Sequence, residues 1–359
     1  MNFPDIRIID AHIHQWDPFT TPREFSAIAR AMRVLPLPES AAVRLGRRRD
    51  REFVGDPAAF LRPYLPADYR ADAAGVPVDT VAHIEVQWAA EDPVAEADET
   101  GWVARLPFDR EGPELGAIVA SADPAEPRFA ALLDAHLAAS PLVCGIRTMV
   151  AHHPDSGVRS FTKVENALTT KEFLAGFGEL AERGLSFDAW VYSPALPDVA
   201  ALAERFPEVP IVLDHLGTPA GIFGRVGRHT GDNPAHRREV FLRWRDDLAA
   251  LAAHPNVVAK VSGLAMPILG HPIPPRAIPT PVGTLLDRVA PMVHHAMDVF
   301  GTNRLLWGSN FPIDKPVTSI ANSLRTIATA LTDHGANPTD LRHVFHDTAH
   351  HTYRITTPV

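Results

Sequence analysis

Two histidines near the amino terminus, His12 and His14, have residue types and a spacing that suit metal or substrate binding. They end a β-branched run that begins at Ile6, and side chains two residues apart on a strand point to one face. Imidazole nitrogens bind zinc and other first-row divalent ions, so the pair could grip one ion from a single side. Chance proximity is the alternative in a chain with 18 histidines. The carboxyl end of a first strand favours a functional pair, because α/β barrels carry their chemistry there.

Eight short apolar runs have the composition of buried parallel strands. They lie at residues 6–14, 81–86, 115–121, 144–150, 185–192, 209–217, 256–263 and 304–312. From the second run onward, stretches with the apolar spacing of helices lie between and after the runs. They lie at residues 91–105, 125–139, 171–183, 196–206, 240–254, 282–300, 317–334 and 338–353. Eight βα repeats close into a barrel, so we predict a single (β/α)8 TIM barrel over residues 1–359. A doubly wound sheet is the alternative, but no glycine-rich dinucleotide turn follows the first strand.

Three long insertions interrupt this alternation, after strands one, six and seven. The first is an irregular, proline-containing region to about residue 75, which we interpret as a lid or binding loop. Its basic run at residues 44–51 is interpreted as a solvated face. A Gly- and Arg-rich insertion at 222–236 and a Pro-rich loop to about residue 281 follow the other two strands. Loops at this end of a barrel select the substrate.

Polar residues gather where the predicted strands end. A barrel would bring them to one mouth, and they are His12, His14, Glu85, Arg147, Asp188, His215 and Asn310. The sequence therefore predicts a shared site built from side chains far apart in the chain.

The composition is that of a globular protein, with 46% hydrophobic and 21% charged residues. A net charge of −9 argues against a nucleic-acid partner. The one cysteine, Cys144, lies in an apolar context that indicates core packing and excludes an intrachain disulfide. No leader segment and no apolar run of membrane-spanning length is found, so we expect a cytoplasmic protein with a small-molecule substrate and no membrane partner.

Five motifs in barrel order resemble the amidohydrolase superfamily, specifically its amidohydrolase-related branch of TIM-barrel metal-dependent hydrolases. They are Ile9-Asp-Ala-His-Ile-His14, His83-x-Glu85, Gly145-Ile-Arg147, Val212-Leu-Asp-His-Leu-Gly217 and Trp307-Gly-Ser-Asn-Phe-Pro312. The resemblance covers nearly all of the chain. It implies a metal-dependent hydrolase, with lactonases and, further off, decarboxylases among the relatives; such relatives are often dimers, so a homodimer is also expected.

The chain departs from the pattern of this branch at two strands. Asn310 stands where relatives have an aspartate that binds metal or accepts a proton, and an amide accepts no proton at neutral pH. Asp314 is the nearest carboxylate that could substitute, or it could cap the next helix or pair with Lys315. Strand five lacks a histidine, which leaves His12 and His14 as expected ligands of a divalent ion such as zinc, with Glu85 or His215 as further candidates.

Further roles follow from the residue types. Arg147 suits a substrate carboxylate or an internal carboxylate, with Glu85 as ligand, base or the partner of that arginine. His215 is expected to act as general acid or base, and its neighbour Asp214 to face the other side of the strand. Asn310 could donate an N–H to an oxyanion.

Residues beside the strand ends are expected to bind substrate. Asp188 could pair with Arg147 or line the pocket, and aromatic residues could form a wall, namely Trp16, Trp88, Trp190 and Tyr192. We predict a hydrolase that opens a lactone or related cyclic ester of a carboxylate-bearing molecule. A lyase (decarboxylase or dehydratase) that uses the same pocket, and a ligand-binding barrel without turnover, are the alternatives.

Overall fold

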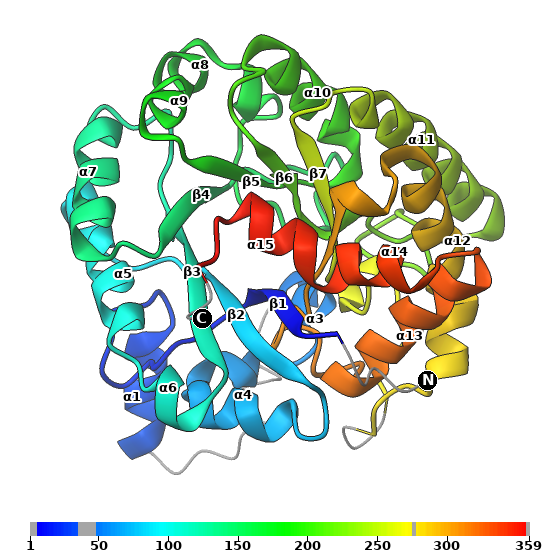
Figure 1. Cartoon of the computed structure of the whole chain (residues 1–359), viewed down its shortest axis with the longest axis horizontal. Helices are drawn as coiled ribbons and strands as arrows, with labels where there is room; N and C mark the ends of the chain where they lie inside the picture. Colours follow the sequence, from blue (N-terminus) through cyan, green and yellow to red (C-terminus); the bar gives the residue numbers. More distant parts are fainter. Residues whose placement is uncertain (1–5, 35–47, 275–277, 357–359) are drawn as a thin grey trace.

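Eight parallel strands in sequence order form the centre of the molecule (Figure 1). The computed structural model describes residues 6–34, 48–274 and 278–356. The strands are β1 Ile8–Ile13, β2 Val78–Ile84, β3 Glu114–Ser121, β4 Val143–Met149, β5 Ser186–Trp190, β6 Ile211–Leu213, β7 Val257–Val261 and β8 Leu305–Trp307. Each lies within or overlaps one of the predicted runs, which confirms the strand assignment.

The first and last strands meet and close the barrel. Residues Ile13 and Phe311 form a parallel bridge, and the backbone N–H groups of His14 and Asn310 donate to the carbonyls of Phe311 and His12, both at 2.9 Å. The chain is therefore an α/β barrel, as predicted. Closure brings the end of β8 directly beside the histidines of β1.

Helices surround the strands and follow the predicted stretches (Figure 1). They include α5 Ala97–Ala104, α7 Phe129–Ala139, α8 Lys171–Phe177, α9 Glu179–Arg183, α10 Leu196–Arg205, α11 Pro234–Ala252, α12 Val282–Phe300 and α13 Ile320–Asp333. Gly184 ends α9 in the left-handed conformation, with φ 61°. Helix α11 begins at Pro234, earlier than predicted, because Asn233 caps it by accepting from the N–H of His236.

The insertion after β1 is largely helical, which corrects the expectation of an irregular loop. It contains α1 Ser26–Val34, α3 Arg48–Val54, the 3-10 turn Pro57–Leu61 and α4 Pro66–Asp72. The short helix α6 Phe108–Glu111 lies further along the chain, just before β3. The beginning and the end of the insertion are joined by two backbone hydrogen bonds between Trp16 and Tyr64, of 3.1 and 2.9 Å. Residues 44–47 of the basic run lie outside the described residues. Arg48 begins α3 as an exposed side chain paired with Glu52.

The carboxyl-terminal helices cross one end of the barrel. They are α14 Pro338–Arg342, the π-helical segment His343–Asp347 and α15 Thr348–Thr352, drawn in red in Figure 1. Tyr353 and Ile355 pack on interior apolar side chains such as Ile84 and Val119. Cys144 belongs to the same cluster and is buried, as predicted. Among the described residues, no helix is long and apolar enough to span a membrane.

Candidate active site

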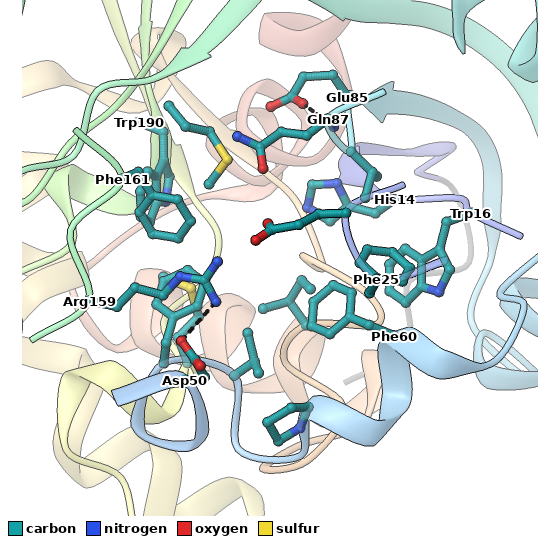
Figure 2. Close-up of a pocket in the computed structure, with 18 of the residues that line it drawn as sticks. His14, Trp16, Phe25, Asp50, Phe60, Glu85, Gln87, Arg159, Phe161 and Trp190 are labelled. Atoms are coloured by element: carbon teal, nitrogen blue, oxygen red, sulfur yellow. Dashed lines mark hydrogen bonds and ion pairs between the residues drawn. The ribbon is translucent and has the colours of Figure 1, made fainter. Parts of the chain in front are cut away.

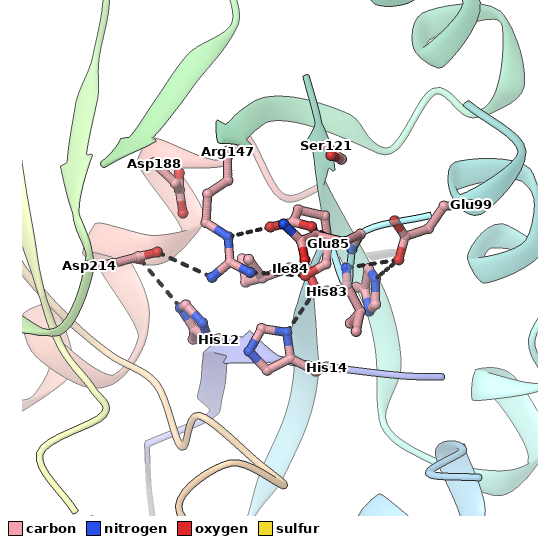
Figure 3. Close-up of polar contacts among 12 residues, drawn as sticks. His12, His14, His83, Ile84, Glu85, Glu99, Ser121, Arg147, Asp188 and Asp214 are labelled. Carbon is pink, nitrogen blue, oxygen red and sulfur yellow. Dashed lines mark hydrogen bonds and ion pairs between the residues drawn. The ribbon is translucent and has the colours of Figure 1, made fainter. Parts of the chain in front are cut away.

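The two histidines of β1 lie together, with ring centroids 5.0 Å apart. The Nδ1 of His14 is 2.9 Å from the carbonyl oxygen of Ile84 on β2, and a carbonyl only accepts, so this nitrogen carries the proton (Figure 3). Asp10, which the sequence analysis left out, supports the strand from behind. Its carboxylate accepts from the N–H groups of His12 and Ser309 and from the hydroxyl of Tyr69. Asp10 thereby joins β1 to β8.

His215 and Asp214 both turn toward His12, which corrects the expectation that they face opposite sides. Strand β6 ends at Leu213, and His215 adopts a left-handed backbone conformation with φ 54°. One ligand atom from each of His12, Asp214 and His215 lies within 4.8 Å of the others. Strand alternation no longer applies once the strand has ended, so both neighbours can lie beside His12.

The end of β7 shapes the environment of His215. The Nδ1 of His215 lies 2.8 Å from the Oγ of Ser262. Gly263 follows with φ 61°, and a Cβ there would lie 2.5 Å from the imidazole ring of His215. The Ser-Gly pair therefore leaves room for the ring and holds its orientation.

A buried lysine, Lys260, lies at the centre of the site, and the sequence analysis missed it. Its Nζ is 3.1 Å from Nδ1 of His12 and 3.0 Å from Oδ1 of Asp214, and it forms an ion pair with Asp188. Asp188 also accepts from the hydroxyl of Tyr353 at 2.7 Å. Asp188 thus pairs with the lysine and not with an arginine, and it does not line the substrate cavity. A lysine inside the apolar run of strand seven was the available signal, because an ammonium is buried only beside carboxylates.

The guanidinium of Arg147 binds groups of the protein itself (Figure 3). Its Nε donates to Oε1 of Glu85 at 2.7 Å and its Nη2 donates to the Glu85 carbonyl at 2.9 Å. The other carboxylate oxygen of Glu85 accepts from the N–H of Gln87 at 2.7 Å. We expected Arg147 to bind either a substrate carboxylate or a carboxylate of the protein. In the structure it binds the protein carboxylate, and Glu85 is its counter-ion.

The end of β8 links Asn310 to Asp314. Asn310 has φ 57°, and its Nδ2 donates to Oδ1 of Asp314 at 2.8 Å, while Oδ2 accepts from the N–H of Ala265 at 3.1 Å. Lys315 pairs with Asp72, so the alternative in which Asp314 pairs with Lys315 is wrong. Asp314 is buried behind Asn310 and does not line the cavity, which leaves it poorly placed to act on substrate.

The three histidines of the site are neutral at pH 7. Burial, followed by the charge of Lys260, holds the pKa of His12 well below its usual range, and burial with the charge of Arg147 does the same for His14. Burial lowers the pKa of His215 to about 3. Burial alone would raise the pKa of Asp214, but Lys260 and His12 outweigh it and hold that pKa well below its ordinary value. A carboxylate and neutral imidazoles are the protonation states that metal binding requires.

A cavity of about 930 Å³ opens above these residues (Figure 2). His14, His215 and Asn310 line its floor, with the Glu85–Arg147 pair beside them. His12 lies beneath and is not part of the lining.

Two of the four expected aromatic wall residues, Trp16 and Trp190, line this cavity. The other two do not. Trp88 lies 4.9 Å from the guanidinium of Arg23, and the hydroxyl of Tyr192 donates to the carbonyl of Arg159 behind the wall. The expectation of an aromatic wall therefore holds for the first pair of residues alone.

The buried charged groups have an excess of negative charge that a bound cation would balance. The carboxylates of Glu85, Asp188 and Asp214 outnumber the cations Arg147 and Lys260, since the histidines are neutral. Within the described part of the chain, Nε2 of His12 has no hydrogen-bond partner, and the carboxylate of Asp214 is held only by ion pairs, with Lys260 at 3.0 Å and Arg147 at 3.6 Å. With His215 they make three ligands, the number that a catalytic zinc uses. These residues therefore fit a divalent ion, with His215 and Asp214 in place of His14.

Comparison with known proteins agrees with this architecture. The chain is 31% identical to the uncharacterized protein y4mH of Sinorhizobium fredii over 354 residues, which cover 98% of this chain and 99% of that protein. It is 30% identical to an L-fucono-1,5-lactonase of Burkholderia ambifaria over 226 residues, 62% of this chain and 66% of the lactonase.

Solved structures share the fold at lower identity. An amidohydrolase from Burkholderia multivorans crystallised with bound zinc has a TM-score of 0.68 at 21% identity, over 98% of this chain and 100% of that one. A 5-carboxyvanillate decarboxylase from Sphingomonas paucimobilis has a TM-score of 0.54 at 14% identity, over 98% of this chain and 100% of that one.

The family model described as amidohydrolase matches residues 9–355, from β1 to the residues that follow α15. Because the match includes every strand and the relative from Sinorhizobium fredii aligns over its whole length, the chain belongs to this amidohydrolase family.

Proposed function

We propose that the protein hydrolyses a lactone or related cyclic ester at the floor of the large cavity. The observation that carries this proposal is the position of His14, a neutral imidazole that lines the cavity and whose Nδ1 is bound to Ile84. The remaining nitrogen, Nε2, then carries a lone pair that can accept a proton. The partial similarity to a lactonase supports the same reaction class.

Hydrolysis needs a water molecule, a proton acceptor and a group that stabilises the oxyanion. In the proposed reaction the water oxygen bonds to the carbonyl carbon while Nε2 of His14 takes the proton. The bond from that carbon to the ring oxygen then breaks, and the ring oxygen takes the proton from His14. The product is the open hydroxy acid, and the histidine returns to its starting state.

Asn310 is suited to stabilise the oxyanion. One N–H of its amide is bound by Asp314, and an amide has a second N–H that the aspartate of relatives lacks. Asn310 lines the floor beside His14 and His215. A donor aimed at a developing oxyanion in a buried site contributes about 10²–10³ in kcat.

His12, Asp214 and His215 would hold a divalent ion such as zinc, which when bound acts as a Lewis acid on the substrate oxygen. Lys260 orients His12 through Nδ1, and Ser262 orients His215 through its own Nδ1. Nε2 of each ring is then the nitrogen left to face the ligand; for His12 this requires the ring proton to lie on Nδ1, where Oδ1 of Asp214, 3.4 Å away, can accept it.

A lyase is the second candidate, because the floor lacks a free carboxylate at the end of β8. Asp314 is engaged by Asn310 and Ala265, and Glu85 is engaged by Arg147. Decarboxylation needs no activated water. Product mass separates the two reactions, since hydrolysis adds one water and decarboxylation removes carbon dioxide.

Substitution of His14 tests the proposal. His14→Gln is expected to lower kcat by about 10²–10⁴, the usual contribution of a general base. The matched control is His229→Gln, since His229 lies in the insertion after β6 and does not line the cavity. Lactone turnover by His14→Gln at the wild-type rate would refute the role of His14, and loss of carbon dioxide from a carboxylate substrate would favour the lyase.

A further inference from the structure

We propose that the natural substrate carries an aromatic or similarly bulky apolar group next to its cyclic ester, and is not a polyhydroxylated sugar lactone. This inference rests on the proposed reaction, and it concerns the walls of the cavity above the reacting floor. The lactonase relative acts on a sugar lactone by its name, so the walls would set this chain apart.

Two groups of aromatic rings face each other across the cavity. Figure 2 shows Phe161 and Trp190 on one side and Trp16, Phe25 and Phe60 on the other. In the first group the two ring planes are perpendicular, and their centroids are 4.9 Å apart. In the second group Trp16 stacks on Phe60 with centroids 4.9 Å apart, and the centroid of Phe25 lies 5.4 Å from that of Phe60. Rings packed in this way form firm walls that suit a flat apolar group.

These walls come from separate parts of the chain. Trp190 ends β5, and Phe161 lies in the loop after β4. Phe25 and Phe60 come from the insertion after β1, which also supplies Phe53 on α3, 5.6 Å from the ring of Trp190. The insertion therefore builds an apolar roof above a polar floor.

Four of the charged residues that line the cavity form two pairs, and the exposed side chains of Glu24 and Arg49 also belong to the lining. Arg159 donates to Asp50 at 3.1 Å. Its planar guanidinium lies 4.7 Å from the centroid of the Phe161 ring and so extends the aromatic wall. At the floor, Arg147 and Glu85 form the other pair. A sugar lactone presents a hydroxyl on most of its carbons, and hydroxyls that are buried without partners reduce binding.

The size of the cavity agrees with an extended substrate. Its volume of about 930 Å³ is near the upper end of small-molecule sites, which span about 300–1,000 Å³. A lone six-membered ring would leave much of the apolar wall in contact with water. A substrate with a second, apolar ring would cover it.

The test compares three lactones with the full-length wild-type protein: δ-valerolactone, δ-phenyl-δ-valerolactone and L-fucono-1,5-lactone. We expect kcat/KM for the phenyl compound to exceed that for the bare ring by about tenfold or more, the effect of a well-filled apolar pocket. The sugar lactone is expected to be the poorest of the three. A sugar lactone turned over as well as the phenyl compound would overturn the inference.

A binding measurement separates this inference from the proposed reaction. The corresponding lactams, δ-valerolactam and its phenyl derivative, lack the labile ester, so calorimetry reports their affinity without turnover. A Kd about tenfold lower for the phenyl lactam supports the apolar wall even if no lactone is hydrolysed, in which case only the reaction is wrong. Equal Kd values overturn the inference whatever the activity.

Variants locate the preference in the walls. Phe60→Ala and Phe161→Ala remove half-buried rings and are expected to reduce the Kd ratio of the two lactams to within about threefold of unity. Phe241→Ala is the matched control, because that half-buried ring packs on Trp244 in α11, away from the cavity. A preference that survives both wall variants would overturn the assignment, and Phe161→Leu gives the same readout if the alanine variants fail to fold.

Discussion

Lys260 contacts His12 directly, with 3.1 Å between Nζ of the lysine and Nδ1 of the imidazole. Oδ1 of Asp214 lies 3.4 Å from the same nitrogen, so Nδ1 of His12 has both an ammonium and a carboxylate beside it. The same ammonium neutralises Asp188 and lies 3.0 Å from Asp214. One buried cation from β7 thus holds together groups from β1, β5 and the end of β6.

Removal of this cation is expected to destabilise the protein strongly. Lys260→Met keeps the approximate volume but leaves Asp188 and Asp214 buried without their counter-ion, and breaking a buried pair in this way costs about 3–5 kcal/mol. Urea unfolding at pH 7 measures the free energy of unfolding.

Lys315→Met is the matched control for Lys260→Met. Lys315 pairs with Asp72, but its side chain is 52% exposed, and such a surface pair contributes at most about 1 kcal/mol. Equal losses in the two variants would contradict the central role of Lys260.

The metal assignment predicts different effects for the histidines. We expect the purified protein to carry zinc, and His12→Ala or His215→Ala to lower zinc content about tenfold or more, because each removes a ligand of the three-residue group. His14→Gln is expected to keep its zinc and lose turnover. Mass spectrometry of metal content, with activity measured in parallel, distinguishes these outcomes. Zinc lost from His14→Gln, but retained by His12→Ala, would show that the ligand set is wrong.

Much of the barrel was predictable because buried parallel strands leave a local signal. The runs around Ile9, Val119 and Leu306 are apolar and short, and polar residues follow them. The convergence of His14, His215 and Asn310 on one cavity follows from barrel closure. The helices of the insertion after β1 were missed because they are short and proline-rich sequence surrounds them.

The pairing of the charged residues was harder to predict. His215 joins Asp214 only because its backbone adopts a positive φ, and the side-chain type does not reveal such a conformation. Arg147 could pair with a substrate or a protein carboxylate on residue type alone, and the distance to Glu85 decides between them. Lys260 did leave a signal, since a charged residue inside an apolar strand requires a buried partner.

Asp314 is expected to make stability depend on pH. Burial raises its pKa from 3.8 to about 7, so the unfolded chain ionises first as the pH rises. Its contribution is therefore fully present below pH 3.8 and is lost progressively as the pH approaches 7. The free energy of unfolding of the wild type, measured relative to Asp314→Asn, should fall between pH 5 and pH 7 and then level off. A constant difference across this range would mean that Asp314 is already ionised in the folded protein.

The contact between Asn310 and Asp314 allows a test of the amide in both stability and activity. Asn310→Asp places a second carboxylate beside Asp314, and loss of the 2.8 Å hydrogen bond in a buried site is expected to cost about 1–3 kcal/mol. The exchange of both residues, Asn310→Asp with Asp314→Asn, restores a donor and an acceptor, because the new amide can donate to position 310 and accept from the N–H of Ala265. Most of the lost stability should return in the double variant.

Activity should not return with stability in this exchange. The double variant lacks the second amide N–H at position 310, so kcat is expected to stay about 10²–10³ below wild type, the effect of losing one oxyanion donor. Stability from urea unfolding and kcat on the same preparations make the comparison. If the exchange instead raised kcat above wild type, a carboxylate at the end of β8 would be the better proton acceptor, and Asn310 would not serve as the oxyanion donor.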